Sequence, residues 1–413
     1  MCYMTKVRKD GKGRRLYKGE CYIKSRGHYR YSYTDVFGNR KYIYSRDLME
    51  LREAEKKLQI DKFDKLDVYL LEKSDINYVF DRFIATRTDL KGTTKSGYLY
   101  TYDHYVRKGF GKKKIADVHY TDILVFYKGL LETGLSIATV ENVNGVIFPT
   151  FQLALRDNVI RSNPAQGVLA ELKRTTKAAS GIRHALTLEQ EREFLKYVDR
   201  PEYLRWKPLF TVMFGTGCRI GEIIGLRWVD VDFKENLISI NHNVSYYPMS
   251  DKDFHCGYEV TTPKTEAGIR YIPMLDKVRE AFLLEKKNQE EFGYHPVMEI
   301  DGMSGFIFCN KVGNLHKISG INKQIKRIVD KHNHFEVIKA RREGRDPLLI
   351  PRFSCHITRH SFCSRLCENE TNIKVIQSVM GHRDIQTTMD IYAEVSEQKK
   401  KDVFKELNED DVI

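Results

Sequence analysis

Three short strings in the second half of the chain set cationic side chains beside features that fix the local backbone. Arg219 follows an apolar segment and a glycine-flanked turn, at the start of a predicted short helix. His356 and Arg359 stand three residues apart, which puts imidazole and guanidinium on one face of a helix. His382 stands in a predicted loop ahead of Tyr392, which the pattern places on a helix. A fold that uses this set has to bring the three strings together around one anion.

The chemistry of these side chains suits a phosphate group. A guanidinium offers a planar fork of donors that matches two phosphate oxygens, and the amino end of a helix adds a favourable potential for an anion. Donors fixed at the non-bridging oxygens stabilise the transition state of phosphoryl transfer, because negative charge grows there during the reaction. A tyrosine hydroxyl, with an ordinary pKa of about 10, is a weak nucleophile unless cations or a base assist it. Taken alone, Arg219 is a surface or capping residue and Tyr392 is one of 24 tyrosines, so the order and spacing of the whole set carry the inference.

The set resembles the signature of the tyrosine recombinase (phage integrase) family, which is an early arginine, a lysine, His-x-x-Arg, Gly-His and a terminal tyrosine. It looks like the integrases of conjugative transposons in particular. The resemblance implies that Tyr392 attacks a DNA phosphodiester, becomes linked to the 3′ phosphate and releases a 5′ hydroxyl, with no metal and no cofactor. The residues that the resemblance assigns to the site are Arg219, Lys264, His356, Arg359, His382 and Tyr392 as catalytic and Glu222 as supporting.

Lys264 is the member of the set that depends most on a local fold. Two β-rich runs, around Val260 and at residues 269–273, flank a loop of Pro, Thr and Gly. The pattern predicts a β-hairpin with Lys264 at its mouth. The resemblance gives this lysine the task of protonating the 5′ oxygen as it departs.

The charge of the chain agrees with a polyanionic partner. The 413 residues carry a formal charge of +13, and the first 46 hold thirteen Lys and Arg against three Asp and Glu. No apolar run reaches the roughly 18 residues that span a bilayer, so no membrane segment is expected. The eight cysteines include no Cys-x-x-Cys pair, which indicates a reduced, cytoplasmic protein without disulfides or zinc. The resemblance implies a bacterial protein that is associated with DNA.

The basic N-terminal segment, residues 1–62, which we name the leader, has the pattern of a small sheet and a helix. Short β-rich runs at residues 20–23, 28–34 and 40–45 precede a helix with apolar residues from Leu48 to Leu58. In the second run, Tyr29 and its alternate neighbours share one face and Arg30 lies on the other, so one face can cover the helix and the other can meet DNA. By resemblance this is an arm-type DNA-binding domain, while a solvated basic sheet and an RNA-binding surface stay open. The candidates for DNA contact here are Arg14, Arg15, Lys24, Arg26, His28, Arg30, Arg40 and Lys41.

A helical module follows the leader. Helices are predicted at residues 76–87, 96–108, 120–133 and 137–157, and Asn163-Pro-Ala marks their end. The module resembles the core-binding domain of the family, and Lys112, Lys113 and Lys114 are candidates for phosphate contact. Thr187 and Gln190 form a predicted capping box that opens the next domain.

The predicted fold class is therefore multidomain and mainly α with small β-sheets. An arm-type DNA-binding domain, a three-stranded sheet plus a helix, spans residues 1–62. A helical core-binding domain spans 75–170, a linker 171–183, and an α+β tyrosine recombinase catalytic domain with a C-terminal tail 184–413. The tail carries Val395, Val403, Phe404 and Leu407 at helical spacing. The resemblance favours exchange of this tail between protomers, and packing within one chain is the alternative.

The implied activity is site-specific recombination that excises and integrates a mobile element through a Holliday junction. The implied partners are double-stranded DNA with core and arm sites, a homo-tetramer on that DNA, an excisionase and a host DNA-bending protein. Three other classes stay open: a type IB topoisomerase-like enzyme, a catalytically inactive DNA-binding regulator and a metal-dependent phosphodiesterase. A metal site at His356 and His360 is disfavoured, because Ile357 stands where the helical zinc motif has glutamate.

Overall fold

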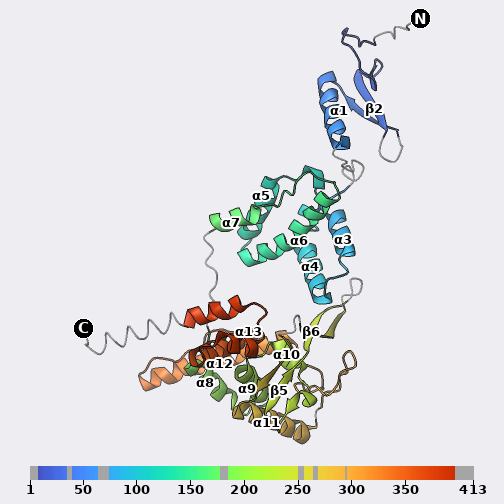
Figure 1. The fold of residues 1–413 in the computed structure, drawn as a ribbon. Coiled ribbons are helices and arrows are strands. Elements are labelled where there is room, and N and C mark those ends of the chain that lie inside the picture. Colours follow the sequence, from blue (N-terminus) through green and yellow to red (C-terminus); the bar gives the residue numbers. More distant parts are fainter. Residues whose placement is uncertain are drawn as a thin grey trace. The chain divides into compact units, whose positions relative to one another are not determined.

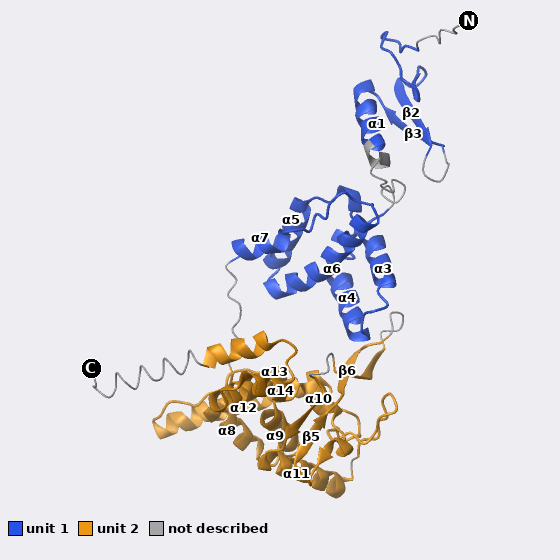
Figure 2. Ribbon diagram, in the orientation of Figure 1, with its two compact units in different colours: residues 1–180 blue, residues 181–413 orange. Residues whose placement is uncertain are grey.

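The computed structural model describes residues 8–34, 40–63, 74–176, 185–249, 255–263, 268–293 and 295–395. The chain divides into two compact units, residues 1–180 and 181–413 (Figure 2). Helices dominate and the sheets are small and antiparallel (Figure 1), so the predicted fold class is confirmed. Among the residues described, no helix combines the length and the apolar character that crossing a bilayer requires.

The first unit contains one small sheet and a set of helices. Its elements are β1 (Glu20–Ile23), β2 (His28–Thr34), β3 (Arg40–Ser45), α1 (Leu48–Phe63), α3 (Ile76–Thr86), α4 (Gly92–Tyr105), η1 (Phe110–Lys112), η2 (Ile115–Asp117), α5 (Tyr120–Glu132), α6 (Ile137–Arg156) and α7 (Val168–Thr175).

The leader folds as its alternation predicts. Strand β2 pairs antiparallel with β1 and β3, and the tyrosine face of the sheet covers α1. Tyr29 is buried in a core with Leu48 and Leu51 of α1, and Tyr31 packs at its edge. Arg30, on the other face, pairs in register with the exposed Tyr44. One face of the sheet therefore packs on α1, and the other, basic and aromatic face is left towards solvent.

The helical module is built around α6, which packs against α3, α4, α5 and α7 over one continuous core. The predicted helices agree with α3, α5 and α6 to within one residue at each end. The predicted helix at 96–108 is wrong in its bounds, because α4 starts at Gly92 and ends at Tyr105. The N–H groups of Gly109 and Gly111 both donate to the oxygen of Val106, and these backbone turns end helix α4 early.

Helix α7 runs into the first residues of the predicted linker at 171–183. It continues to Thr175 because Val168 and Leu172 are buried against the helical core, which the polar composition of this stretch did not indicate. Of the remaining predicted linker, residues 177–183 lie outside the described residues.

The second unit holds the rest of the described elements. They are α8 (Leu188–Val198), η3 (Leu204–Trp206), α9 (Lys207–Thr216), α10 (Ile220–Gly225), η4 (Trp228–Asp230), β4 (Val231–Asp232), β5 (Leu237–Ile240), β6 (Asn243–Pro248), β7 (Cys256–Thr261), β8 (Arg270–Pro273), α11 (Asp276–Phe292), α12 (Ile318–Glu343), α13 (Cys355–Asn369) and α14 (Ile373–Met380). A further helical stretch covers 385–395.

Helix α9 lies at the centre of this unit, packed against α8, α10, α11 and α13. Its buried Phe210 and Phe214 join a core that extends to strand residues such as Ile238 and Ile272. The predicted capping box is confirmed at the start of α8, where Thr187 Oγ1 accepts from the N–H of Gln190 at 3.2 Å.

The predicted hairpin around Lys264 is wrong in its pairing. Strand β7 pairs with β6, and β8 pairs with β5, so the two strands that flank Lys264 do not pair with each other. The reversal of the chain lies between β6 and β7, where the N–H of Met249 donates to the oxygen of His255 at 2.7 Å. Between β7 and β8 the structure describes residues 262–263 and 268–269. Local composition could not reveal this pairing, because it does not set which strands hydrogen-bond to each other.

Candidate active site

Arg219 occupies the N-cap of α10, where the sequence placed it. Gly217 ends α9 in the left-handed conformation, with φ of 61°, and a Cβ there would overlap the ring of Phe362 on α13. This close approach turns the chain sharply into α10. The N–H of Arg219 donates to Glu222 Oε2 at 2.9 Å, and its Nη1 donates to Glu222 Oε1 at 2.9 Å.

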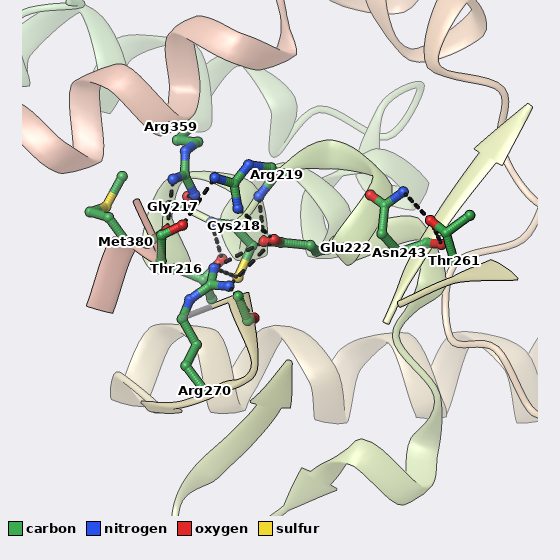
Figure 3. A network of polar contacts seen from close by, with 12 residues as sticks. Thr216, Gly217, Cys218, Arg219, Glu222, Asn243, Thr261, Arg270, Arg359 and Met380 are labelled. Carbon is green, nitrogen blue, oxygen red and sulfur yellow. Dashed lines mark hydrogen bonds and ion pairs between the residues drawn. The ribbon is translucent and has the colours of Figure 1, made fainter. Parts of the chain in front are cut away.

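Glu222 is itself held by a second arginine, Arg270 of β8, which the sequence analysis did not assign to the site. Arg270 Nη2 donates to Glu222 Oε2 at 2.9 Å and Nη1 to Oε1 at 3.3 Å (Figure 3). Both side chains are almost fully buried, at 5% and 3% exposed. The signal that could have revealed Arg270 is strand alternation, because Arg270 shares the buried face of β8 with Ile272.

Arg359 projects from α13 into the same cluster. Its Nη1 donates to the oxygen of Gly217 at 2.8 Å and its Nη2 to the oxygen of Met380 at 2.6 Å. His356 lies one turn earlier on α13 and is exposed, whereas Arg359 is 4% exposed. The predicted shared face therefore runs from the protein interior at Arg359 towards solvent at His356.

Three successive backbone carbonyl groups at the carboxyl end of α14 accept hydrogen bonds from three arginines. The oxygen of Val379 accepts from Arg270 Nε at 2.7 Å, in addition to the Met380 contact with Arg359. The oxygen of Gly381 accepts from Arg219 Nη2 at 3.0 Å. The carboxyl end of a helix carries a partial negative charge that favours such cations. These contacts tie the segment leading to His382 to the arginine cluster.

His382 is buried next to this helix end. Its Nδ1 lies 2.9 Å from the hydroxyl of Thr388, which is fully buried on the helical stretch 385–395. Thr388 was quoted in the sequence string but given no role. Its place one helical turn before Tyr392 is the signal that pointed to it, because residues four apart share a helix face.

Tyr392 is half-buried on the same stretch. Together with Ile391 and Val395 it packs against an apolar cluster that includes Phe362 and Cys363 of α13. The tyrosine helix is thus attached both to α13, which carries Arg359, and through Thr388 to the histidine loop.

The electrostatics of the cluster indicate an excess of positive charge. Burial, followed by the Arg219 guanidinium, lowers the pKa of Arg359 to about 10. Burial, followed by Arg359 and Arg219, lowers the pKa of His382 to about 4. Burial raises the pKa of Glu222, but the hydrogen bonds and charges of Arg270 and Arg219 together outweigh burial and hold the pKa below its ordinary value. At neutral pH the cluster therefore contains charged arginines, an ionised glutamate and a neutral histidine.

The structure brings Arg219, Glu222, Arg359 and His382 together and holds Tyr392 on the adjoining helix. Lys264 lies outside the described residues, as does the predicted tail beyond Val395. Gly268, four residues after Lys264, is described, and its oxygen accepts from Arg270 Nη1 at 3.1 Å.

The predicted DNA-contact residues differ in their exposure and in the contacts that their side chains make. Arg15, Lys24, Arg26, Arg40, Lys112 and Lys114 are exposed, and His28 and Lys41 are half-buried. Arg14 instead supports the leader fold, since its Nε donates to Asp10 at 2.9 Å and its Nη2 to the hydroxyl of Tyr29 at 2.6 Å. Arg30 stacks 4.8 Å from the ring of Tyr42, and Lys113 donates to Asp122 at 2.7 Å.

Comparisons with known proteins agree with this geometry. The model of the phage integrase family matches residues 184–399, and that of the DNA-binding domain of Tn916 integrase matches residues 4–62. The transposase from transposon Tn1545 of Streptococcus pneumoniae is 29% identical over 424 residues, which covers 98% of each chain. The transposase from transposon Tn916 of Enterococcus faecalis is 28% identical with the same coverage. A solved structure of Tn1549 transposon integrase with transposon right end DNA has a TM-score of 0.67 and 27% identity, and the match covers 79% of this chain and 99% of that one.

Proposed function

This chain belongs to the phage integrase family and is a tyrosine-type site-specific recombinase, and we propose that Tyr392 is the nucleophile with which it cuts and rejoins DNA. The Tyr392 hydroxyl attacks the scissile phosphorus and displaces the 5′ oxygen, so that a 3′-phosphotyrosine bond replaces the phosphodiester. The 5′ hydroxyl of a partner strand then reverses the step. Because one ester replaces another, the bond energy is retained for rejoining.

Arg219, Arg359, His356 and His382 act on the non-bridging oxygens. The guanidinium groups bind the phosphate in the ground state and stabilise the charge that grows on it, which is the largest contribution that fixed donors make to such reactions. His382 acts as a neutral donor, since its pKa is about 4. Lys264 supplies a proton to the departing 5′ oxygen.

One observation carries the proposal: among the residues described, the buried cluster holds more guanidinium groups than carboxylates. Among the residues described, Arg219 and Arg270 pair with the carboxylate of Glu222, whereas Arg359 donates to two backbone carbonyl groups. The remaining contacts of the three arginines are carbonyl groups and the sulfur of Cys218, which are all uncharged acceptors. Burial, and then this crowding of cations, lowers the pKa values of Arg359 and His382. A phosphodiester at the open side of Arg219, whose side chain is 44% exposed, would offset it.

The rest of the chain supplies DNA binding. The solvent face of the leader sheet, with Arg30 between the exposed Tyr42 and Tyr44, reads arm sites, and the helical module with Lys112 and Lys114 holds the core site. The relatives named as transposases of Tn1545 and Tn916 support a mobile element as the substrate. The enzyme excises and integrates this element as a homo-tetramer through a Holliday junction, assisted by an excisionase and a host DNA-bending protein.

The test is covalent trapping on the DNA ends that the full-length protein protects from nuclease. A nick near the scissile bond lets the short cut strand diffuse away, so rejoining is blocked and the adduct accumulates. Wild-type protein is expected to give a DNA-linked band in denaturing electrophoresis, with EDTA present, and Tyr392→Phe is expected to give none. The matched control is Tyr271→Phe, an exposed tyrosine on β8 that is 68% exposed. An adduct with Tyr392→Phe would refute the nucleophile, and recombination of a two-site plasmid separates this enzyme from a topoisomerase, which would only relax it.

A further inference from the structure

Arg270 places a charge where its strand should have an apolar residue. Along β8 the buried positions are Arg270 and Ile272, while Tyr271 and Pro273 face solvent. A buried guanidinium is costly unless every donor direction finds a partner. The contacts of Arg270 therefore indicate what the side chain does.

The partners of Arg270 come from three segments, two of which lead directly to a residue of the proposed site. Through Glu222 it reaches the N-cap of α10, which is Arg219. Through the oxygen of Val379, 2.7 Å from Nε, it reaches the end of α14, three residues before His382. Through the oxygen of Gly268, 3.1 Å from Nη1, it also holds the described residues just before β8.

The planar guanidinium is what allows one side chain to hold three segments. Its five N–H donors point in fixed directions, whereas an ammonium group is a compact charge on a flexible stem. Arg270 also occupies both oxygens of Glu222, so the carboxylate cannot rotate away from Arg219 (Figure 3). Glu222 in turn accepts hydrogen bonds from the backbone N–H and from the guanidinium of Arg219.

We propose that Arg270 is a positioning residue that sets Arg219 and the helix end before His382 in register for phosphoryl transfer. It does not touch the phosphate, because its donors are directed at Glu222, Cys218, Val379 and Gly268 within a buried site. This inference rests on the proposed function, since it concerns the same reaction. Displacement of a positioned group by about 1 Å can cost about 100-fold in rate.

The experiment uses the full-length chain with Arg270→Lys, which keeps the charge and loses the fork, and Arg270→Gln, which keeps a planar donor and loses the charge. Single-turnover cleavage of the nicked substrate is expected to slow by about 100-fold for Arg270→Lys. Binding of the same duplex by the non-cleaving Tyr392→Phe background is expected to change by less than about threefold. The matched control is Arg227→Lys, because Arg227 forms a similar ion pair with Asp230 at 3.2 Å outside the cluster.

A double-mutant comparison distinguishes positioning from a general loss of stability. If Arg270 acts through Arg219, then Arg270→Lys is expected to slow cleavage by less than about threefold in an Arg219→Lys background, because the positioned group is already lost. Full multiplication of the two effects would overturn the proposal. So would cleavage by Arg270→Lys at the rate of the Arg227→Lys control, or loss of DNA binding by both Arg270 variants, which would make its role one of folding. None of these outcomes changes whether Tyr392→Phe abolishes the adduct, so failure of the proposed function is recognised separately.

Discussion

Thr388 offers a direct test of how the site holds its buried histidine. The ring of His382 is neutral at neutral pH, since its pKa is about 4, so one ring nitrogen accepts a hydrogen bond and the other donates. A Thr388 hydroxyl that donates to Nδ1, 2.9 Å away, keeps the proton on Nε2. Nε2 is then the atom that can donate to a phosphate oxygen.

Thr388→Val removes the hydroxyl and keeps the branched shape of the side chain. A neutral hydrogen bond contributes about 0.5–1.5 kcal/mol, and because Thr388 is 0% exposed we expect the upper part of that range. A loss of about 1.4 kcal/mol in the transition state corresponds to about tenfold slower cleavage. Leaving Nδ1 buried without its partner is also expected to lower the free energy of unfolding by about 1–3 kcal/mol.

The assays are single-turnover cleavage of the nicked duplex and urea unfolding. The control is Thr387→Val, which makes the same chemical change at the exposed neighbouring position. Thr388→Ser, which retains a hydroxyl, is expected to keep most of the rate. If Thr388→Val and Thr387→Val cleave at the same rate, then Thr388 does not orient His382 and the reasoning is refuted.

Three further predictions concern pH, the leaving group and the leader. His382 has a folded pKa of about 4 against an ordinary 6.5, so its contribution to stability is present above pH 6.5 and is lost as pH falls through 4, by about 3 kcal/mol. Urea unfolding between pH 7 and pH 4 is expected to show a shallower pH dependence for His382→Gln than for wild type, and equal slopes would contradict the assignment. Lys264→Ala is expected to cleave ordinary DNA slowly but to approach the wild-type rate when the bridging 5′ oxygen is replaced by sulfur, because a thiolate leaves without a proton. If the variant cleaves the sulfur-substituted DNA as slowly as ordinary DNA, Lys264 is not the general acid. Deletion of residues 1–62 is expected to keep core cleavage and to abolish binding to arm sites, with a steep salt dependence of the lost binding, and loss of cleavage would show that the leader is not a separate DNA-binding part.

The sequence predicted those features that depend on neighbours along the chain. The alternation of Tyr29, Tyr31 and Tyr33 placed a buried face on β2, and the Gly-flanked turn placed Arg219 at the start of α10. His356 and Arg359 lie on one helix because three residues make nearly one turn.

Features that depend on distant parts of the chain were not predicted. The pairing of β7 with β6 and of β8 with β5 is set by register across the sheets, which the composition around Lys264 does not encode. Arg270 gains its role from Glu222, which is 48 residues away. Thr388 is only 6 residues from His382, but their contact depends on how the chain turns between them. A charged residue in a buried strand position is the kind of local inconsistency that marks such a role, because the cost of its burial requires partners from elsewhere in the fold.

The polarity and the position of the covalent bond test the central claim most directly. The trapped adduct made with wild-type protein is digested with protease, and the DNA-linked peptide is identified by mass spectrometry, while a kinase tests the cut DNA for a free 5′ hydroxyl. The account predicts a phosphodiester between Tyr392 and the 3′ end of the DNA, with a 5′ hydroxyl on the other strand end. A bond to another residue, or to the 5′ end of the DNA, would contradict it.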